Sequence, residues 1–101
     1  MQFGEYLRNL REERQLLQRE IASMLEMDMA LLSKIERGTR RAKRERVNAF
    51  AKAYNVDPKE LDRRWLVDQV IELLKDEQDP EAILKYAEKE INNTNKSNTI
   101  S

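Results

Sequence analysis

The sequence predicts an all-α protein, and three observations carry this prediction. Apolar residues recur at the i, i+3, i+4 and i+7 spacing of a helix along most of the 101 residues. No segment alternates apolar and polar residues as a half-buried strand does, and no β-hairpin turn signal occurs. Capping residues mark the expected helix ends. Asp57-Pro58 and Asp79-Pro80 each predict an N-cap followed by proline at the start of a helix, and Gly38 predicts a C-cap.

The first three expected helices are short, and each has one apolar face. They cover residues 3–14, 18–25 and 29–37, and Asp28 is the expected N-cap of the third. With 40% apolar residues, the chain has enough material for one compact core. In these helices the residues expected to face that core are Phe3, Tyr6, Leu7, Leu10, Ile21, Ala22, Leu25, Leu32 and Ile35.

Three further helices are expected over residues 43–54, 58–75 and 80–91. Residues 92–101 are rich in Asn, Thr and Ser, with Ile100 as their one large apolar residue, and a disordered tail is expected there. The apolar positions of the three helices are Val47, Phe50, Ala51, Tyr54, Leu61, Trp65, Leu66, Val70, Ile71, Leu73, Leu74, Ile83, Tyr86, Ala87 and Ile91.

The composition excludes several classes of function. The chain has no Cys and no His, which excludes disulfides, Cys/His metal sites and catalysis that needs either residue. Its carboxylates fall on charged helix faces without a glycine-rich loop, so an enzyme is not expected, nor is a cofactor or small-molecule ligand. No signal peptide and no run of about 18 apolar residues is visible, so a cytoplasmic protein without a membrane partner is expected.

Charge is unevenly distributed although the net charge is zero. Residues 1–56 contain 12 Lys or Arg and 8 Asp or Glu, whereas residues 57–90 contain 6 and 11. The local maximum is residues 37–46 (RGTRRAKRER), with six basic residues and one acidic residue. This division favours two surfaces with different partners, the alternative being chance scatter in a chain that is 38% charged.

The segment QREIASMLEMDMALLSKIERG, residues 18–38, predicts two short helices joined by about three residues. The small side chain of Ala22 allows the two helices to approach closely, and Leu25, Leu32 and Ile35 fill the space between them. One face of the second helix then stays free to meet base edges in a major groove, which is the geometry of a helix-turn-helix.

Residues 3–61 resemble the phage-repressor and Cro-like helix-turn-helix family, often called the XRE family. The resemblance implies a five-helix DNA-binding domain over residues 1–61, followed by a C-terminal helical extension, and an ion pair between Arg11 and Glu36. Glu26 stands where the family usually has glycine, which implies a positive φ at a cost of about 1 kcal/mol, or a slightly different turn. The resemblance is carried by Gln18, Ala22, residues 33–38 (SKIERG), residues 47–56 (VNAFAKAYNV) and Leu61.

The resemblance also implies which residues contact DNA. Lys34 is the main candidate for guanine, and apolar side chains at the start of the same helix would meet thymine methyls. The alternative for Met29 and Leu31 is a place in the core or in a protein–protein patch, and the alternative for the basic loop is a solvated charge run. The base-reading candidates are Met29, Ala30, Ser33 and Lys34; the phosphate-binding candidates are Gln18, Arg37, Thr39, Arg40, Arg41, Lys43 and Arg44.

Residues 62–91 contain more apolar side chains than a helical hairpin buries within itself. Because operators of this family are read by two-fold dimers, this hairpin is the predicted dimerisation element. The alternative is that it packs back on the first and fourth helices of a monomer. Its acidic residues, Asp68 among them, are expected to be solvated or to bind a basic partner. The predicted dimer contacts are Trp65, Ile71, Leu74, Ile83, Tyr86 and Ala87.

Together these features predict a transcriptional regulator, more specifically a dimeric repressor, that reads double-stranded operator DNA with its third helix. The alternative is a protein-interaction module such as the antitoxin of a toxin–antitoxin pair. The family includes phage repressors, restriction–modification controllers and antitoxins, and the resemblance does not separate them.

Overall fold

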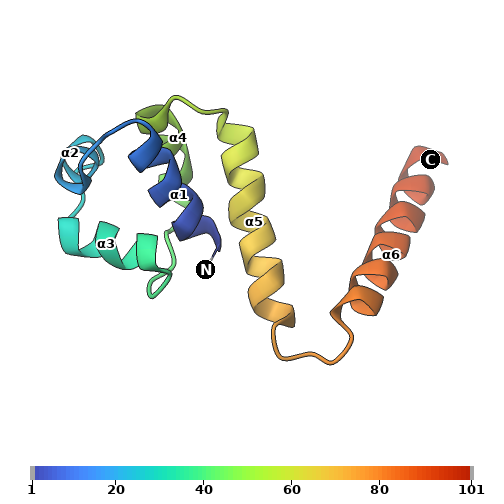
Figure 1. Ribbon diagram of the computed structural model, residues 1–101. Helices are drawn as coiled ribbons and strands as arrows, with labels where there is room; N and C mark the ends of the chain where they lie inside the picture. Colours follow the sequence, from blue (N-terminus) through green and yellow to red (C-terminus); the bar gives the residue numbers. More distant parts are fainter. Residues whose placement is uncertain (1, 101) are drawn as a thin grey trace.

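The computed structural model describes residues 2–100, with side chains described for residues 2–95. Over this range the chain is all-helical, which confirms the predicted fold class (Figure 1). The elements are α1 (Gln2–Glu13), α2 (Gln18–Met24), α3 (Met29–Arg37), the 3-10 helix η1 (Arg44–Arg46), α4 (Val47–Tyr54), α5 (Pro58–Leu74) and α6 (Pro80–Ile100).

Capping residues set the helix ends where the sequence places them. Asp28 accepts a hydrogen bond from the backbone N–H of Ala30 (3.2 Å) and so begins α3. Gly38 ends that helix in the left-handed conformation, with φ 79°. Asp57 accepts from the N–H of Lys59 (3.0 Å) at the start of α5. The expected helix over residues 43–54 is divided, because its first turn winds as η1 and α4 begins only at residue 47.

The C-terminal helix is longer than composition suggests. A disordered tail was expected from Asn92, whereas α6 continues to Ile100; Ser101 lies outside the described residues. Asp79 starts the helix by accepting from the N–H of Ala82 (3.1 Å), and extending an existing helix is far less costly than starting one. The Thr94 hydroxyl donates to the Glu90 carbonyl (2.9 Å), which satisfies a side chain that would otherwise compete with the helix for backbone partners.

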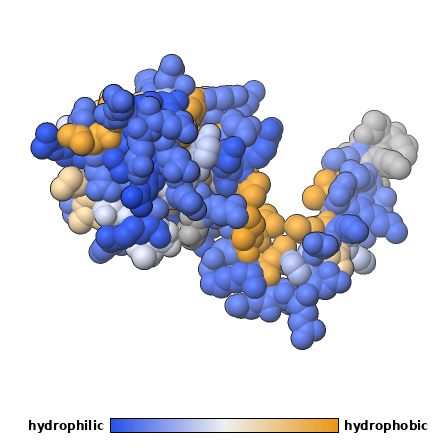
Figure 2. All heavy atoms as spheres, viewed as in Figure 1, coloured by the Kyte–Doolittle hydropathy of each residue, from blue (hydrophilic) through white to orange (hydrophobic). Residues whose placement is uncertain are grey.

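The core lies among α1, α2, α3, α4 and the first half of α5. Figure 1 shows these helices gathered on one side, while α5 runs away from them and α6 stands apart. No residue of α6 within 80–95 is buried. Hydrophobic atoms are instead visible along α5 and α6 on their facing sides (Figure 2). The buried core consists of Phe3, Leu7, Leu10, Ile21, Ala22, Leu25, Leu32, Ile35, Ala42, Val47, Phe50, Ala51, Tyr54 and Leu61.

Gly4 allows α1 to lie directly against the end of α3. A Cβ atom at this position would lie 2.0 Å from the carbonyl oxygen of Ile35 and 3.0 Å from that of Glu36. Both neighbours are backbone atoms, which cannot rotate out of the way as a side chain can. No sequence motif marked Gly4, yet this residue sets how closely α1 approaches α3.

The turn between α2 and α3 contains the departure noted at Glu26. This residue has φ 52°, so a non-glycine residue occupies the left-handed conformation there. The backbone N–H of Met27 donates to the carbonyl of Ala22 (2.8 Å) and closes the turn. Of the two alternatives expected at this position, Glu26 therefore adopts the positive φ.

The described part of the chain has neither a membrane-spanning helix nor a metal-binding cluster. None of its helices has the length and apolar character to cross a membrane. Within the same residues, no cluster of His, Cys, Asp and Glu has a geometry that would hold a metal ion.

Candidate nucleic-acid interface

A buried carboxylate anchors α3 to the helices around it. Arg11 Nε lies 2.8 Å from Glu36 Oε2, and Arg11 Nη2 lies 3.1 Å from Glu36 Oε1, so the pair implied by the family resemblance is present and bidentate. The hydrogen bond to Glu36 raises the pKa of Arg11 above its usual value. The third guanidinium nitrogen of Arg11, Nη1, donates to the carbonyl of Leu16 (2.9 Å). Arg11 therefore joins α1 and the loop after it to α3 through Glu36.

Gln18 belongs to the same network. Its side-chain Nε2 donates to Glu36 Oε1 (2.9 Å), which adds the start of α2 to the anchor. Sequence reasoning assigned Gln18 to a DNA phosphate and missed this inward bond. Nothing in the spacing of residues 18 and 36 indicates it, because the contact depends on how α2 and α3 cross.

The opposite face of α3 points away from the core. Met29 is 50% exposed, Ala30 and Lys34 are exposed, and Ser33 is half-buried. Leu31 is half-buried and packs against the core, which supports the alternative interpretation given for it. Met29 does not lie in the core, because its side chain faces solvent.

The basic loop, residues 37–43, folds back on the end of α3. The N–H groups of Thr39 and Arg40 both donate to the carbonyl of Lys34, at 3.0 and 3.3 Å, and the Thr39 hydroxyl donates to the same oxygen at 3.2 Å. Among the side chains of residues 2–95, the cations of this loop and of Lys34 form no ion pair within 4.0 Å. The exposed residues of this group are Lys34, Arg37, Arg40, Arg41 and Lys43, and Arg41 lies near enough to Glu72 to help lower the pKa of that carboxyl.

One residue of the loop is buried and ties it to α5. Ala42 is part of the core, and its carbonyl accepts a hydrogen bond from Trp65 Nε1 (2.8 Å). Trp65 itself is half-buried against the core. It was predicted to contact a partner subunit, but its indole faces its own chain, because a helical repeat of apolar residues does not say which partner they meet.

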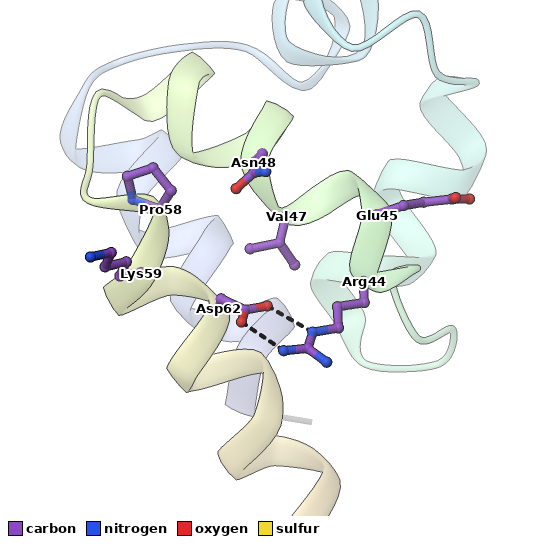
Figure 3. A pocket seen from close by; sticks show the side chains of 7 residues that line it. All are labelled: Arg44, Glu45, Val47, Asn48, Pro58, Lys59 and Asp62. Carbon is purple, nitrogen blue, oxygen red and sulfur yellow. Dashed lines mark hydrogen bonds and ion pairs between the residues drawn. The ribbon is translucent and has the colours of Figure 1, made fainter.

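Arg44 is already paired. Its Nε and Nη2 atoms donate to the two carboxylate oxygens of Asp62 at 3.0 and 2.9 Å (Figure 3), and its guanidinium lies 5.8 Å from the centre of the Trp65 ring. The same hydrogen bond lowers the pKa of Asp62 below its usual value. The pair lines an open hollow of about 400 Å³ between η1 and the start of α5. Arg44 therefore has less charge to offer a phosphate than its neighbours in the loop.

Two more residues differ from their expected roles. Arg46 was not singled out, and its Nη1 donates to the Leu25 carbonyl (2.7 Å) at the end of α2. Asp68 was expected on a solvated acidic face, but it is buried and accepts from the N–H of Gln2 (3.1 Å) at the start of α1. A carboxylate there interacts favourably with the helix dipole. Because Asp68 stands among many acidic residues in the sequence, its charge did not indicate that it is buried.

The remaining predicted dimer contacts lie on α5 and α6. Leu74 is buried near the end of α5 but is not part of the core cluster. Ile71, Ile83, Tyr86 and Ala87 are exposed.

A helix held at a fixed angle by a shorter one, with its outer face free and a basic loop at its end, defines a DNA-binding helix-turn-helix domain. A family model described as a helix-turn-helix domain matches residues 2–63, and the chain belongs to that family. No curated protein and no solved structure matches the chain.

Proposed function

We propose that this chain is a transcriptional regulator, more specifically a dimeric repressor, that acts in the cytoplasm by placing α3 in the major groove of operator DNA. The observation that carries the proposal is the contrast between the two faces of α3. Its inner face is fixed by the Glu36 network and by contact with Gly4, while its outer face and the adjoining loop present exposed cations that form no ion pair within 4.0 Å among residues 2–95. A repressor of this kind blocks transcription by occupying the promoter.

The exposed side chains suggest a division of roles. Lys34 reads guanine, while Met29 and Ala30 contact thymine methyls and Ser33 takes a polar base edge. The loop residues Arg37, Thr39, Arg40, Arg41 and Lys43 lie along the phosphate backbone, where each neutralised phosphate adds salt dependence. Gln18 keeps a second amide N–H that can reach a phosphate, because its bond to Glu36 uses only one.

The test is the binding of labelled duplexes, followed by fluorescence anisotropy at about 50 and about 200 mM salt. One duplex carries the DNA upstream of the protein's own gene, and a second has the same composition in scrambled order. Tighter binding to the first is expected, with a log–log salt slope of about −4 to −5 for four to six phosphates. Absence of binding to either duplex at low salt would overturn the proposal.

Two variants separate base reading from phosphate contact. Lys34→Ala should lose about 10-fold or more on the upstream duplex and little on the scrambled one. Arg40→Ala/Arg41→Ala should weaken binding to both duplexes alike and reduce the slope by about two. The matched control is Lys85→Ala/Lys89→Ala, which removes two exposed cations from α6 and should leave both affinities unchanged.

A second candidate function rests on a separate observation. The exposed apolar residues of α5 and α6 would also suit a protein-interaction module, such as an antitoxin that binds its toxin through this part of the chain. In that case, changes on α5 and α6 would abolish capture of a different protein and leave the mass of the isolated chain unchanged.

A further inference from the structure

The solvent-facing side of α5 carries an apolar face that no other part of residues 2–95 covers. Leu66, Val67, Val70 and Ile71 lie on the side away from the buried residue Leu61, and each is 40–48% exposed. Their spacing of one, three or four residues places them on one side of the helix. Val67 stands at the edge of the set, where it also lines a hollow shared with Phe3 and Tyr6 of α1. This set is called the α5 wall below.

A second apolar face lies on α6. Ile83, Leu84, Ala87 and Ile91 follow helical spacing, and the three large side chains are 44–60% exposed. This set is called the α6 wall. Figure 2 shows hydrophobic atoms of α5 and α6 facing each other across an open gap, so the two walls line the inside of a V.

The closed end of the V is well defined. The N–H of Glu77 donates to the Leu74 carbonyl (3.1 Å), and Asp79 caps α6. Leu74 is buried at this end, whereas the walls above it are open. A helix with no packed face has little stability in water, and contiguous apolar patches of this kind mark interaction sites. The inside of the V therefore has the character of an interaction surface.

We propose that the V is occupied by a second copy of this chain, with α6 of each copy packed antiparallel against the α5 wall of its partner. One copy presents both an α5 wall and an α6 wall, so a two-fold pair covers all four walls at once. A single foreign helix would have to match both walls of the V by itself. The proposal rests on the dimeric regulator proposed above. In this dimer each α6 packs against α5 of the partner subunit, whereas in a closed hairpin it would pack against α5 of its own chain.

Charge complementarity supports the antiparallel direction. The α5 wall continues toward the start of its helix in the exposed cations Lys59 and Arg63. Arg63 lies 3.4 Å from Glu60 in an exposed i,i+3 ion pair, a kind of pair that contributes little and leaves the guanidinium able to exchange partners. The second half of the α6 wall is flanked by the exposed carboxylates Glu88 and Glu90. Antiparallel packing brings the carboxylates of one copy to Lys59 and Arg63 of the partner subunit, whereas parallel packing would place them at the acidic end of α5.

The first measurement is the mass of the full chain without DNA, by size exclusion with light scattering. A dimer has twice the chain mass of 12.0 kDa. Val70→Asp and Leu84→Asp each place a charge in a wall and should raise the dimer dissociation constant by about 100-fold or more. Met24→Asp is the control, because Met24 is 61% exposed on α2, away from the V, and should leave the dimer intact. Since no DNA is present, loss of the dimer is read separately from loss of DNA binding.

Two charge-reversal variants distinguish packing of α6 against α5 of the partner subunit from packing of α6 against α5 of its own chain. Lys59→Glu/Arg63→Glu and Glu88→Lys/Glu90→Lys should each be monomeric, because like charges then face each other across the interface. An equimolar mixture should form a heterodimer, since both contacts are again between opposite charges. Two variants that stay monomeric when mixed would show that α6 pairs with its own α5, and would overturn the proposal. A wild-type chain that is monomeric at about 100 μM would also overturn it.

Discussion

Replacement of Gly4 by alanine should destabilise the protein, although helix propensity alone predicts the reverse. An alanine in mid-helix is favoured over glycine by about 0.5–1 kcal/mol. The new Cβ, however, would lie 2.0 Å from the Ile35 carbonyl oxygen, and an ordinary contact is at least 3.4 Å. Helix α1 would therefore have to move by about 1 Å or more, and overpacking of this kind costs about 1–3 kcal/mol or more.

The expected net loss is about 2 kcal/mol of unfolding free energy, or a fall in Tm of about 8–15 °C for a domain of this size. Thermal unfolding followed by circular dichroism measures it. The matched control is Asn9→Ala, an exposed position on the same helix, where the Tm should rise slightly because only propensity changes. A Gly4→Ala protein as stable as the Asn9→Ala protein would refute the close approach of α1 to α3.

The remaining predictions concern the anchors of the interface. Glu36→Gln should lower unfolding free energy by about 2–4 kcal/mol in urea, because it leaves Arg11 without its charged partner. Trp65→Phe keeps an aromatic side chain but removes the hydrogen bond to the Ala42 carbonyl, so both duplexes should bind about 5–10-fold more weakly. A change on one duplex only would contradict this. Asp62→Asn frees Arg44 for a phosphate and should steepen the salt slope by up to about 0.9, whereas an unchanged slope would show that Arg44 stays away from DNA. Burial raises the pKa of Tyr54, whose hydroxyl has no hydrogen-bond partner among the described residues. As the pH rises, the Tyr54 hydroxyl therefore loses its proton in the unfolded chain before it does so in the folded chain. The free energy of unfolding should be unaffected below pH about 10 and should fall above that pH by up to about 1.4 kcal/mol per pH unit. Urea titrations from neutral to alkaline pH should show that slope removed in Tyr54→Phe.

Local signals in the sequence were sufficient for the ends of the helices that carry a capping residue. The residues that cap α3 and α5 act through bonds to the next few residues, so their effect is visible in a short window. The bounds predicted for the third helix, 29–37, agree with α3. The tail was misjudged because composition describes the preference of isolated residues, whereas α6 extends a helix already started at Asp79.

The interface was predicted less completely, because its anchors join distant parts of the chain. Arg44 meets Asp62 eighteen residues away, and Trp65 meets Ala42 across twenty-three. A run of basic residues shows that cations gather, but not which of them is neutralised by a carboxylate from another helix. In the same way, the acidic character of residues 57–90 hides the buried position of Asp68.

Helix α5 connects the two surfaces on which the proposals depend. Its inner side holds the basic loop through Trp65 and the start of α1 through Asp68, while its outer side carries the α5 wall. A helix of 17 residues, about 25 Å long, behaves as one rigid body over that length. The position of a partner's α6 on the wall would therefore fix the direction of α5 and, through the loop, the separation of the two α3 helices. It follows that lengthening the spacer between two half-sites by half a helical turn should remove the tight binding of the dimer. Val70→Asp, acting as a monomer, should bind both spacings alike.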